Sequence, residues 1–173
     1  MASGALQQIL GQTLWGDLDY LIIDMPPGTG DIHLTLSQKA PVSGAVIVTT
    51  PQDIALLDAM KGIEMFAKVD IPVLGIVENM SVHECSSCGH ISHLFGADGG
   101  RRVAEDLSVP LLGQLPLAMS IREQADGGQP TVKVEPDSKI SGLYRDAARN
   151  MAAQLWARKS TAAATPTISM VDD

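Results

Sequence analysis

Aromatic residues, positive charge and long apolar runs are all scarce in this sequence of 173 residues. Aromatic side chains make up 3% of it, too few for the stacking platforms on which proteins bind single-stranded nucleic acid. The 12 Lys and Arg residues stand against 20 Asp and Glu residues, and the resulting net charge of -8 repels phosphate backbones. We therefore expect no nucleic acid among the partners of this protein.

Segments that would direct the chain to a membrane are also missing. No apolar run approaches the ~20 residues that a membrane-spanning helix needs. The start of the chain, MASGALQQIL, lacks the basic segment and the long apolar core of a secretion signal. We expect a cytoplasmic protein without a membrane partner, and its length suits one domain that needs no metal or disulfide to fold.

Two further absences concern chemistry. Cys85 and Cys88 are the only cysteines, which excludes a disulfide framework and favours a local metal or redox role. No segment has the pattern GxxxxGK followed by Ser or Thr, the loop that cradles nucleotide phosphates. No residue of this chain can therefore supply a phosphate-cradling lysine.

The sequence does contain alternating apolar runs and amphipathic segments, the pattern of an α/β fold with a parallel β-sheet flanked by helices. We expect one domain over residues 1–158, with a metal loop at about residues 80–95, and a disordered tail over residues 159–173. The predicted strands are 18–24, 44–49, 73–77 and 110–115, and the predicted helices are 3–14, 31–39, 52–69, 99–107, 120–124 and 138–158.

Individual residues of these helices have predicted roles. Ile54 and Leu57 belong to the broad apolar face expected for the helix of residues 52–69. Asp98 is predicted to cap the helix of residues 99–107, and either Ser138 or Asp137 is predicted to cap the helix of residues 138–158.

The stretch LDYLIIDMPPGTGD carries the first candidate site. Asp24 ends a predicted buried strand, where ligands of open α/β sheets bind, and it suits a Mg²⁺-phosphate site of the Walker B kind. Gly28 and Gly30 let backbone N–H groups approach an anion, and Thr29 adds a hydroxyl donor. Two plainer interpretations stay open: a strand that ends in a solvated turn, and a tight turn that caps the next helix.

Asn79 follows another predicted strand and is expected at the same edge of the sheet as Asp24. Its amide can both donate to and accept from the edge of a nucleotide base. An asparagine at the end of a strand is also a common turn former, and that interpretation stays open.

Cys85 and Cys88 lie in the sequence CSSCGH, a knuckle in which two thiolates can chelate one metal. Two ligands rarely complete a site, and spacing alone leaves three interpretations open. They are a zinc site that recruits a histidine, a thioredoxin-like redox pair at the start of a helix, and a cluster that pools the cysteines of two chains. The histidines of this loop are His83, His90 and His93.

The chain resembles the carboxyl two thirds of Mrp/ApbC-type ATPases, the iron-sulfur cluster carrier proteins. Six segments carry the resemblance: DYLIIDMPPGTGD, VIVTTPQDIALLDAMKGIEMF, VLGIVENM, CSSCGH, LFG and PLLGQLPL. The similarity runs from about Ser3 to Trp156. It implies a P-loop NTPase fold of the MinD-like kind that is incomplete at the N-terminus, because the family's GKGGVGKS-like loop is missing.

This resemblance also implies a function. Proteins of the family form homodimers, bind ATP and Mg²⁺, and hold a [4Fe-4S] cluster between the CxxC pairs of two subunits for delivery to apo iron-sulfur proteins. With the phosphate-cradling loop missing, the alternative is a truncated, non-hydrolysing dimerisation module that binds zinc or a cluster. The roles implied by match to the family pattern are Asp24 as Walker B acid, Gly28 near the γ-phosphate, Asn79 and Pro116 around adenine, and Cys85 and Cys88 as cluster ligands.

Overall fold

The structure is a computed structural model that describes residues 2–25 and 40–162. No helix in these two ranges is both long and apolar enough to cross a membrane. The helices are α1 (Ala2–Gln12), α3 (Asp53–Lys68), α4 (Gly99–Asp106), α5 (Met119–Asp126), α6 (Thr131–Val134) and α7 (Lys139–Ala162); the strands are β1 (Ala45–Thr49), β2 (Val73–Glu78), β3 (His83–Glu84), β4 (Ile91–Ser92) and β5 (Leu111–Gln114).

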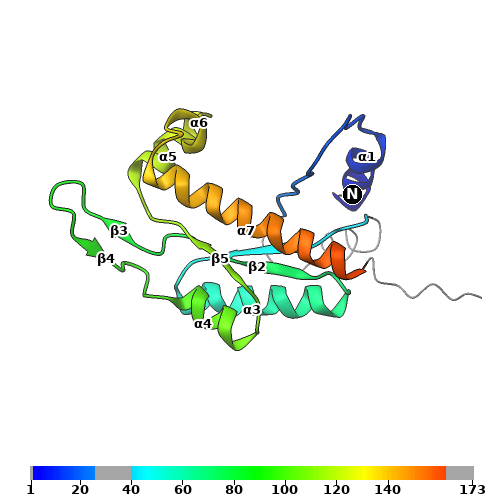
Figure 1. The fold of residues 1–173 in the computed structure, drawn as a ribbon, viewed down its shortest axis with the longest axis horizontal. Coiled ribbons are helices and arrows are strands. Elements are labelled where there is room, and N and C mark those ends of the chain that lie inside the picture. The colour runs from blue at the N-terminus through cyan, green and yellow to red at the C-terminus, as the bar shows by residue number, and fades with distance from the viewer. Residues whose placement is uncertain (1, 26–39, 163–173) are drawn as a thin grey trace, which may run out of the picture.

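Three parallel strands form the central sheet in the order β1-β2-β5. Helices α3 and α4 pack on one face of this sheet and α7 packs on the other (Figure 1). Every residue of β2, the middle strand, is buried. The described residues thus form the predicted α/β arrangement of a parallel sheet between two layers of helices.

Each face of the sheet has its own apolar core. Successive side chains of a strand point to opposite faces, so Ile76 faces α3 and α4 while Val77 faces α7. The core under α3 and α4 contains Ile47, Leu56, Ala59, Ile63, Val73, Ile76, Val103 and Ala104. The core under α7 contains Val77, Leu112 and Leu115, with Val46, Leu143, Tyr144 and Met151 packed against them.

A glycine lets β2 and β5 come together at this level. Gly75 has a φ of +152°, and a Cβ added there would lie 2.5 Å from the carbonyl oxygen of Pro110. No real Cβ tolerates so close a contact. Glycine at this position therefore permits the pairing of β2 with β5.

Residues 18–24 form no strand, so the prediction of a buried strand there is wrong for this structure. Leu18 is 51% exposed and Ile22 is 73% exposed. A strand is stabilised by hydrogen bonds to a neighbouring strand, and among the described residues β2 is the only strand that pairs with β1. Residues 18–24 pair with no described strand, not even with the open edge of β1, and without those hydrogen bonds this apolar run is a surface segment.

The other predicted strands, and the helices that became α1, α3 and α4, are confirmed within about two residues. α5 is longer than the predicted single turn, α6 has no predicted counterpart, and α7 ends at Ala162 rather than near residue 158. On α3, Leu56 is 7% exposed, whereas Ile54 and Leu57 are 75% and 52% exposed. The buried face of α3 is narrower than predicted because no described strand lies beyond β1.

Candidate functional site

The carboxyl ends of the three parallel strands bring Asn79 and Pro116 to the same edge of the sheet. The Asn79 N–H donates to the carbonyl oxygen of Thr49, at 2.7 Å, which ties the end of β2 to the end of β1. The Leu117 N–H donates to the carbonyl oxygen of Val82, at 2.8 Å, so the backbone around Pro116 runs beside the segment that follows Asn79. Asn79 and Pro116 therefore lie on neighbouring segments, and their shared role around adenine stays a prediction.

The side chain of Asn79 behaves partly as a turn former. Its Oδ1 accepts from the Met80 N–H at 2.9 Å, and Met80 has a φ of +55°. The amide nitrogen of Asn79 has no hydrogen-bond partner within residues 2–25 and 40–162, and it keeps two donors for a ligand. The two sequence interpretations of Asn79 are therefore compatible.

The phosphate half of the candidate site is described only in part. Asp24 is exposed and lies in a segment without regular structure. Gly28, Thr29 and Gly30 lie outside the described residues, as does the predicted helix of residues 31–39. The roles of these four residues in nucleotide binding stay predictions.

Both cysteines lie at the tip of the hairpin formed by β3 and β4, which extends away from the sheet and the helices (Figure 1). The Cys85 N–H donates to the carbonyl oxygen of His90 at 2.9 Å, and the Gly89 N–H donates to the carbonyl oxygen of Cys85 at 2.8 Å. Gly89 has a φ of +70°, which favours glycine. The structure thus has the predicted knuckle, with Cys88 exposed and Cys85 half-buried.

The knuckle also favours a thiolate at Cys85. The backbone N–H of Ser87, followed by that of Cys88, lowers the pKa of the Cys85 thiol because both donate to its charged form. A thiolate is the form of cysteine that binds metals. The backbone of the loop therefore favours the charged form of Cys85.

The surroundings of the knuckle bear on the three sequence interpretations. No group of three or more His, Cys, Asp or Glu side chains suited to a metal ion occurs in the part of the chain that the structure describes. His83, His90 and His93 thus do not assemble a site with the cysteines in one chain. The cysteines lie in a turn between two strands and not at the start of a helix, unlike a thioredoxin-like pair.

A buried carboxylate beside the sheet edge was missed by the sequence interpretation. Glu78 ends β2 with 0% exposure, and it accepts from the Gly100 N–H and, at 2.8 Å, from Nε2 of Gln114. The only signal for it was an acidic residue that closes the apolar run VLGIV. Its partners are distant in sequence, so spacing could not identify them.

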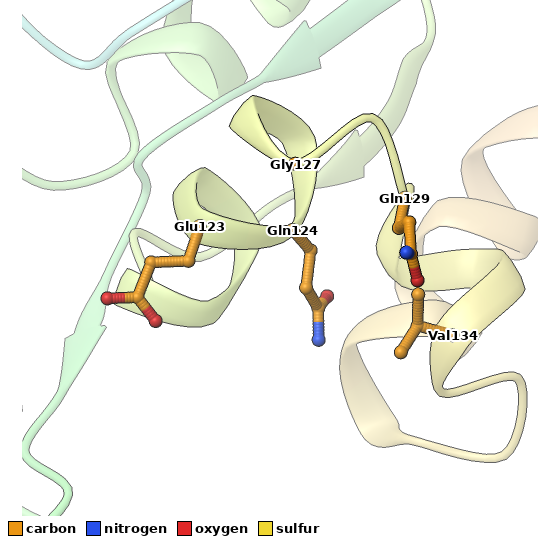
Figure 2. Close-up of a pocket in the computed structure, with 5 residues that line it drawn as sticks. All are labelled: Glu123, Gln124, Gly127, Gln129 and Val134. Carbon is orange, nitrogen blue, oxygen red and sulfur yellow. The ribbon is translucent and has the colours of Figure 1, made fainter.

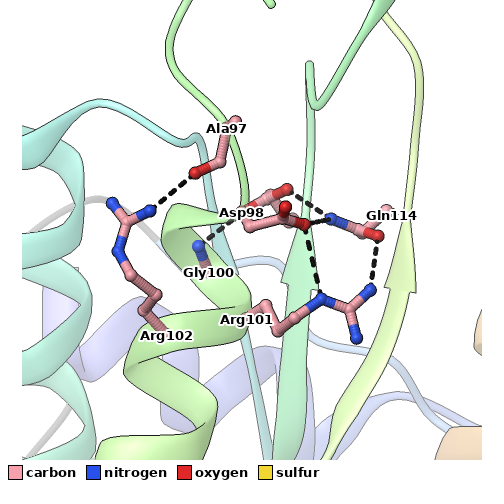
Figure 3. A network of polar contacts seen from close by, with 7 residues as sticks. Ala97, Asp98, Gly100, Arg101, Arg102 and Gln114 are labelled. Carbon is pink, nitrogen blue, oxygen red and sulfur yellow. Dashed lines mark hydrogen bonds and ion pairs between the residues drawn. The ribbon is translucent and has the colours of Figure 1, made fainter.

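The same glutamine, which binds Glu78, also bonds with Asp98 and Arg101 (Figure 3). Nε2 of Gln114 donates to Asp98 at 3.1 Å, and Nη2 of Arg101 donates to Oε1 of Gln114 at 3.0 Å. Hydrogen bonds from Gln114, followed by those from Arg101, hold the pKa of Asp98 below its ordinary value. Asp98 occupies the predicted N-cap position of α4, but its side chain makes no capping hydrogen bond.

Of the two residues predicted to cap α7, Ser138 and Asp137, Ser138 makes the contact. Its Oγ accepts from the Ser141 N–H at 3.2 Å, the contact expected of a side chain that caps a helix.

A small cavity of about 270 Å³ lies at α5 and α6 (Figure 2). Nε2 of Gln124 donates to Glu135 at 2.8 Å, while its buried Oε1 has no hydrogen-bond partner among the described residues. The cavity is slightly smaller than most ligand pockets. Its buried acceptor, Oε1 of Gln124, suits a small hydrogen-bond donor such as water. It is lined by Glu123, Gln124, Gly127, Gln129 and Val134.

This sheet with helices on both faces has the fold of P-loop NTPases related to MinD. A nucleotide-binding protein from Archaeoglobus fulgidus, solved in complex with ADP, is 40% identical with a TM-score of 0.66, over 73% of this chain and 52% of that chain. MinD from Pyrococcus horikoshii, solved with Mg-ADP, is 26% identical with a TM-score of 0.62, over 84% of this chain and 55% of that one.

Residues 1–152 match the ParA family described as NUBPL iron-transfer P-loop NTPase. The chain therefore belongs to this family.

Relatives with known names agree with this membership. The iron-sulfur cluster carrier protein of Pseudomonas fragi is 65% identical over 148 residues, which are 86% of this chain and 52% of the relative. The protein of the same name from Escherichia coli K12 is 62% identical, over 90% of this chain and 42% of the relative. The mouse iron-sulfur cluster transfer protein NUBPL is 56% identical, over 83% of this chain and 45% of the relative. The chain spans about half the length of these relatives, less than the two thirds that the motifs suggested.

Proposed function

We propose that this protein carries an iron-sulfur cluster, held as [4Fe-4S] between two copies of the chain, and transfers it to apo iron-sulfur proteins. The observation that carries the proposal is the pair of accessible cysteines, Cys85 and Cys88, on a projecting hairpin. The names of the bacterial and mouse relatives, which describe cluster carriers or transfer proteins, support it.

The number of ligands supports the pooling of two chains. A [4Fe-4S] cluster is commonly held by four cysteine thiolates, and this chain has two cysteines. Within the described residues no histidine or carboxylate joins them to form a larger ligand group. Two copies that meet at their hairpins would supply all four thiolates without a change in the loop.

We further propose that ATP with Mg²⁺ binds at the carboxyl edge of the sheet and controls cluster retention. In this proposal Asp24 is the Walker B acid, Gly28, Thr29 and Gly30 bind phosphate oxygens, and Asn79 and Pro116 frame adenine. The Archaeoglobus and Pyrococcus structures contain ADP and Mg-ADP, respectively, which supports a nucleotide at this fold. A cytoplasmic location stays a prediction.

The second candidate function is a non-hydrolysing dimerisation module that binds zinc or a cluster. One observation favours it: Asp24 lies exposed in a segment without a strand, whereas ligands of open α/β sheets bind at the carboxyl ends of strands. Under this proposal the cysteines keep their role and the nucleotide is absent or only bound.

Anaerobic reconstitution with ferrous iron and sulfide tests the first proposal. We expect visible charge-transfer absorbance and about four irons per two chains, as Cys₄ ligation of one [4Fe-4S] cluster requires. Cys85→Ser and Cys88→Ser should each abolish this absorbance, whereas Ser86→Ala, a control in the same turn, should retain it. A colourless product that holds one zinc ion per chain would refute the cluster and favour the second candidate.

A further inference from the structure

Residues 79–98 form a long excursion from the sheet, which we name the cysteine excursion because it includes β3, β4 and both cysteines. It begins directly after Glu78 at the end of β2 and returns to the sheet at Gly99, where α4 starts. The two ends of the excursion therefore lie close together, beside Glu78. The side chain of Glu78 is fully buried, with 0% exposure.

The Glu78 carboxylate joins three parts of the fold. It belongs to β2, its Oε2 accepts from the Gly100 N–H at the first turn of α4, and its Oε1 accepts from Gln114 at the end of β5. An anion at a helix N-terminus is favourable because the first N–H groups have no partner in the helix. Glu78 thus bonds directly to the returning end of the excursion.

The packing around Glu78 leaves little room for the returning chain to move. A Cβ added to Gly100 would lie 3.0 Å from both Cβ and Oε2 of Glu78. A Cβ added to Gly99 would lie 2.7 Å from the carbonyl oxygen of Pro51. The two glycines permit a close approach that larger residues would prevent.

Other hydrogen bonds fix the base of the excursion from the opposite side. The Ser81 N–H donates to the carbonyl oxygen of Leu115 at 3.0 Å, and the Leu115 N–H donates to that of Glu78 at 2.8 Å. Asp98 is held by Gln114, the residue that also binds Glu78. One end of the excursion is therefore attached to Gln114, the last residue of β5, and the other to Leu115, the residue that follows it.

A buried carboxylate is a costly way to close a strand, since a well-packed apolar side chain often gives equal or greater stability. An apolar side chain could not accept hydrogen bonds from Gly100 and Gln114. Through these two hydrogen bonds, Glu78 fixes the positions at which the excursion leaves the sheet and returns to it.

We propose that Glu78 is a positioning residue that holds the hairpin with Cys85 and Cys88 at a set place on the sheet edge, so that the thiolates of two copies can share one cluster. This inference rests on the proposed cluster-carrier function. The hairpin projects away from the helices (Figure 1), and the ion pair recorded between it and α7 joins the exposed side chains of Glu84 and Lys139 at 3.7 Å. An exposed ion pair contributes little, so the orientation of the hairpin is set mainly at its base.

Two variants and one control test the role of Glu78 in the whole chain. Glu78→Gln keeps an acceptor for Gly100 but places an NH₂ group against Nε2 of Gln114. Gly100→Ala keeps the carboxylate but displaces it, because the added Cβ would lie 3.0 Å from Oε2 of Glu78. Glu105→Gln removes the same charge from an exposed position on α4 and serves as the control.

Two readouts are measured on each variant. After anaerobic reconstitution, Glu78→Gln and Gly100→Ala should lose iron to a chelator about tenfold faster than the control, the low end of the effect of groups that orient metal ligands. In the metal-free protein, the amides of Ser81 and Leu117, at the base of the excursion, should exchange hydrogen faster. The Ile76 amide, bonded to Pro110 at 2.8 Å within the sheet, should not change.

Each outcome decides the proposal. Iron retention equal to that of the control, in both variants, would overturn it, and so would exchange that rises at Ile76 as much as at Ser81, since this indicates only a loss of stability. If the unsubstituted chain takes up no cluster, the proposed function fails. Hydrogen exchange at Ser81 and Leu117 still tests whether Glu78 holds the base of the excursion. Unchanged exchange rates at these two amides in both variants would overturn that role.

Discussion

Residues 18–24 and residues 85–89 both carry side chains with a proposed chemical role, yet they are held in different ways. The first segment contains Asp24 and makes no backbone hydrogen bond to any other described residue. The second segment contains both cysteines and is closed by bonds of its own backbone, including the 2.8 Å bond from Gly89 to Cys85.

This difference shows what each kind of site requires. A turn such as residues 85–89 needs only its own residues, because its donors and acceptors are a few positions apart. A strand that presents Asp24 to a ligand needs a neighbouring strand to hold it. In the described structure the cluster half of the candidate site is organised, whereas residues 18–24, the described part of the phosphate half, form no regular structure.

The largest effect expected is the loss of ATP hydrolysis when Asp24 is replaced. In a longer protein of this family that has the GKGGVGKS-like loop, Asp24→Ala should lower Mg²⁺-dependent ATP hydrolysis by about 100-fold or more, because the carboxylate would help to hold the metal. Asp19→Ala, in the same segment, is the control. Equal turnover of the two variants in a phosphate-release assay would remove Asp24 from the Walker B role.

A pair of isoleucines tests the contrast between exposed segment and core. Ile76 is 0% exposed and Ile22 is 73% exposed. Ile76→Ala should lower the free energy of unfolding by about 2–5 kcal/mol because it leaves a cavity, whereas Ile22→Ala should change it by less than about 0.5 kcal/mol. Urea denaturation measures both. Similar losses would mean that residues 18–24 are packed in solution, in contradiction to their exposure in the structure.

A pair of glycines tests the turn that holds the cysteines. Gly89→Ala should destabilise the protein by about 1–2 kcal/mol, since an L-residue is strained at a φ of +70°. Gly142→Ala, in α7 with no atom within 4 Å of the added Cβ, should stabilise it by about 0.5–1 kcal/mol. Thermal unfolding with the cysteines reduced distinguishes a lowered melting temperature for Gly89→Ala from a raised one for Gly142→Ala. An unchanged melting temperature for Gly89→Ala would show that the conformation of this turn does not contribute to stability.

The sequence predicted the elements whose stabilising contacts it encodes locally. The apolar runs of β1, β2 and β5, the amphipathic α3 and the Gly89 turn were all evident from periodicity or spacing. Residues 18–24 were mispredicted because their apolar pattern is that of a strand, while a strand also depends on a partner.

Glu78 illustrates the other limit of sequence reasoning. Its burial depends on Gly100 and Gln114, which are 22 and 36 positions away. No short pattern joins these three residues. Asn79, by contrast, was expected at the sheet edge because the strands of a parallel sheet end there, and Pro116 was expected near it only through the family resemblance.

The smallest effect expected is a shift in the reactivity of Cys85 with pH. Because backbone N–H groups lower its pKa in the folded state, alkylation by iodoacetamide should rise at lower pH in the folded protein than in urea. The thiolate contributes stability above the unfolded pKa, and this contribution is lost as the pH falls through the folded pKa. Peptide mass spectrometry after alkylation follows Cys85 separately from Cys88. Coincident pH profiles would contradict the geometry of the turn.

The central claim is that one cluster is shared by two chains through Cys85 and Cys88. Native mass spectrometry of the anaerobically reconstituted protein tests it most directly, because it counts chains and cluster in one particle. We predict a species of two chains with one [4Fe-4S] cluster, absent from the Cys85→Ser variant. A single chain that holds its own metal, with no dimer at any protein concentration tested, would contradict the claim.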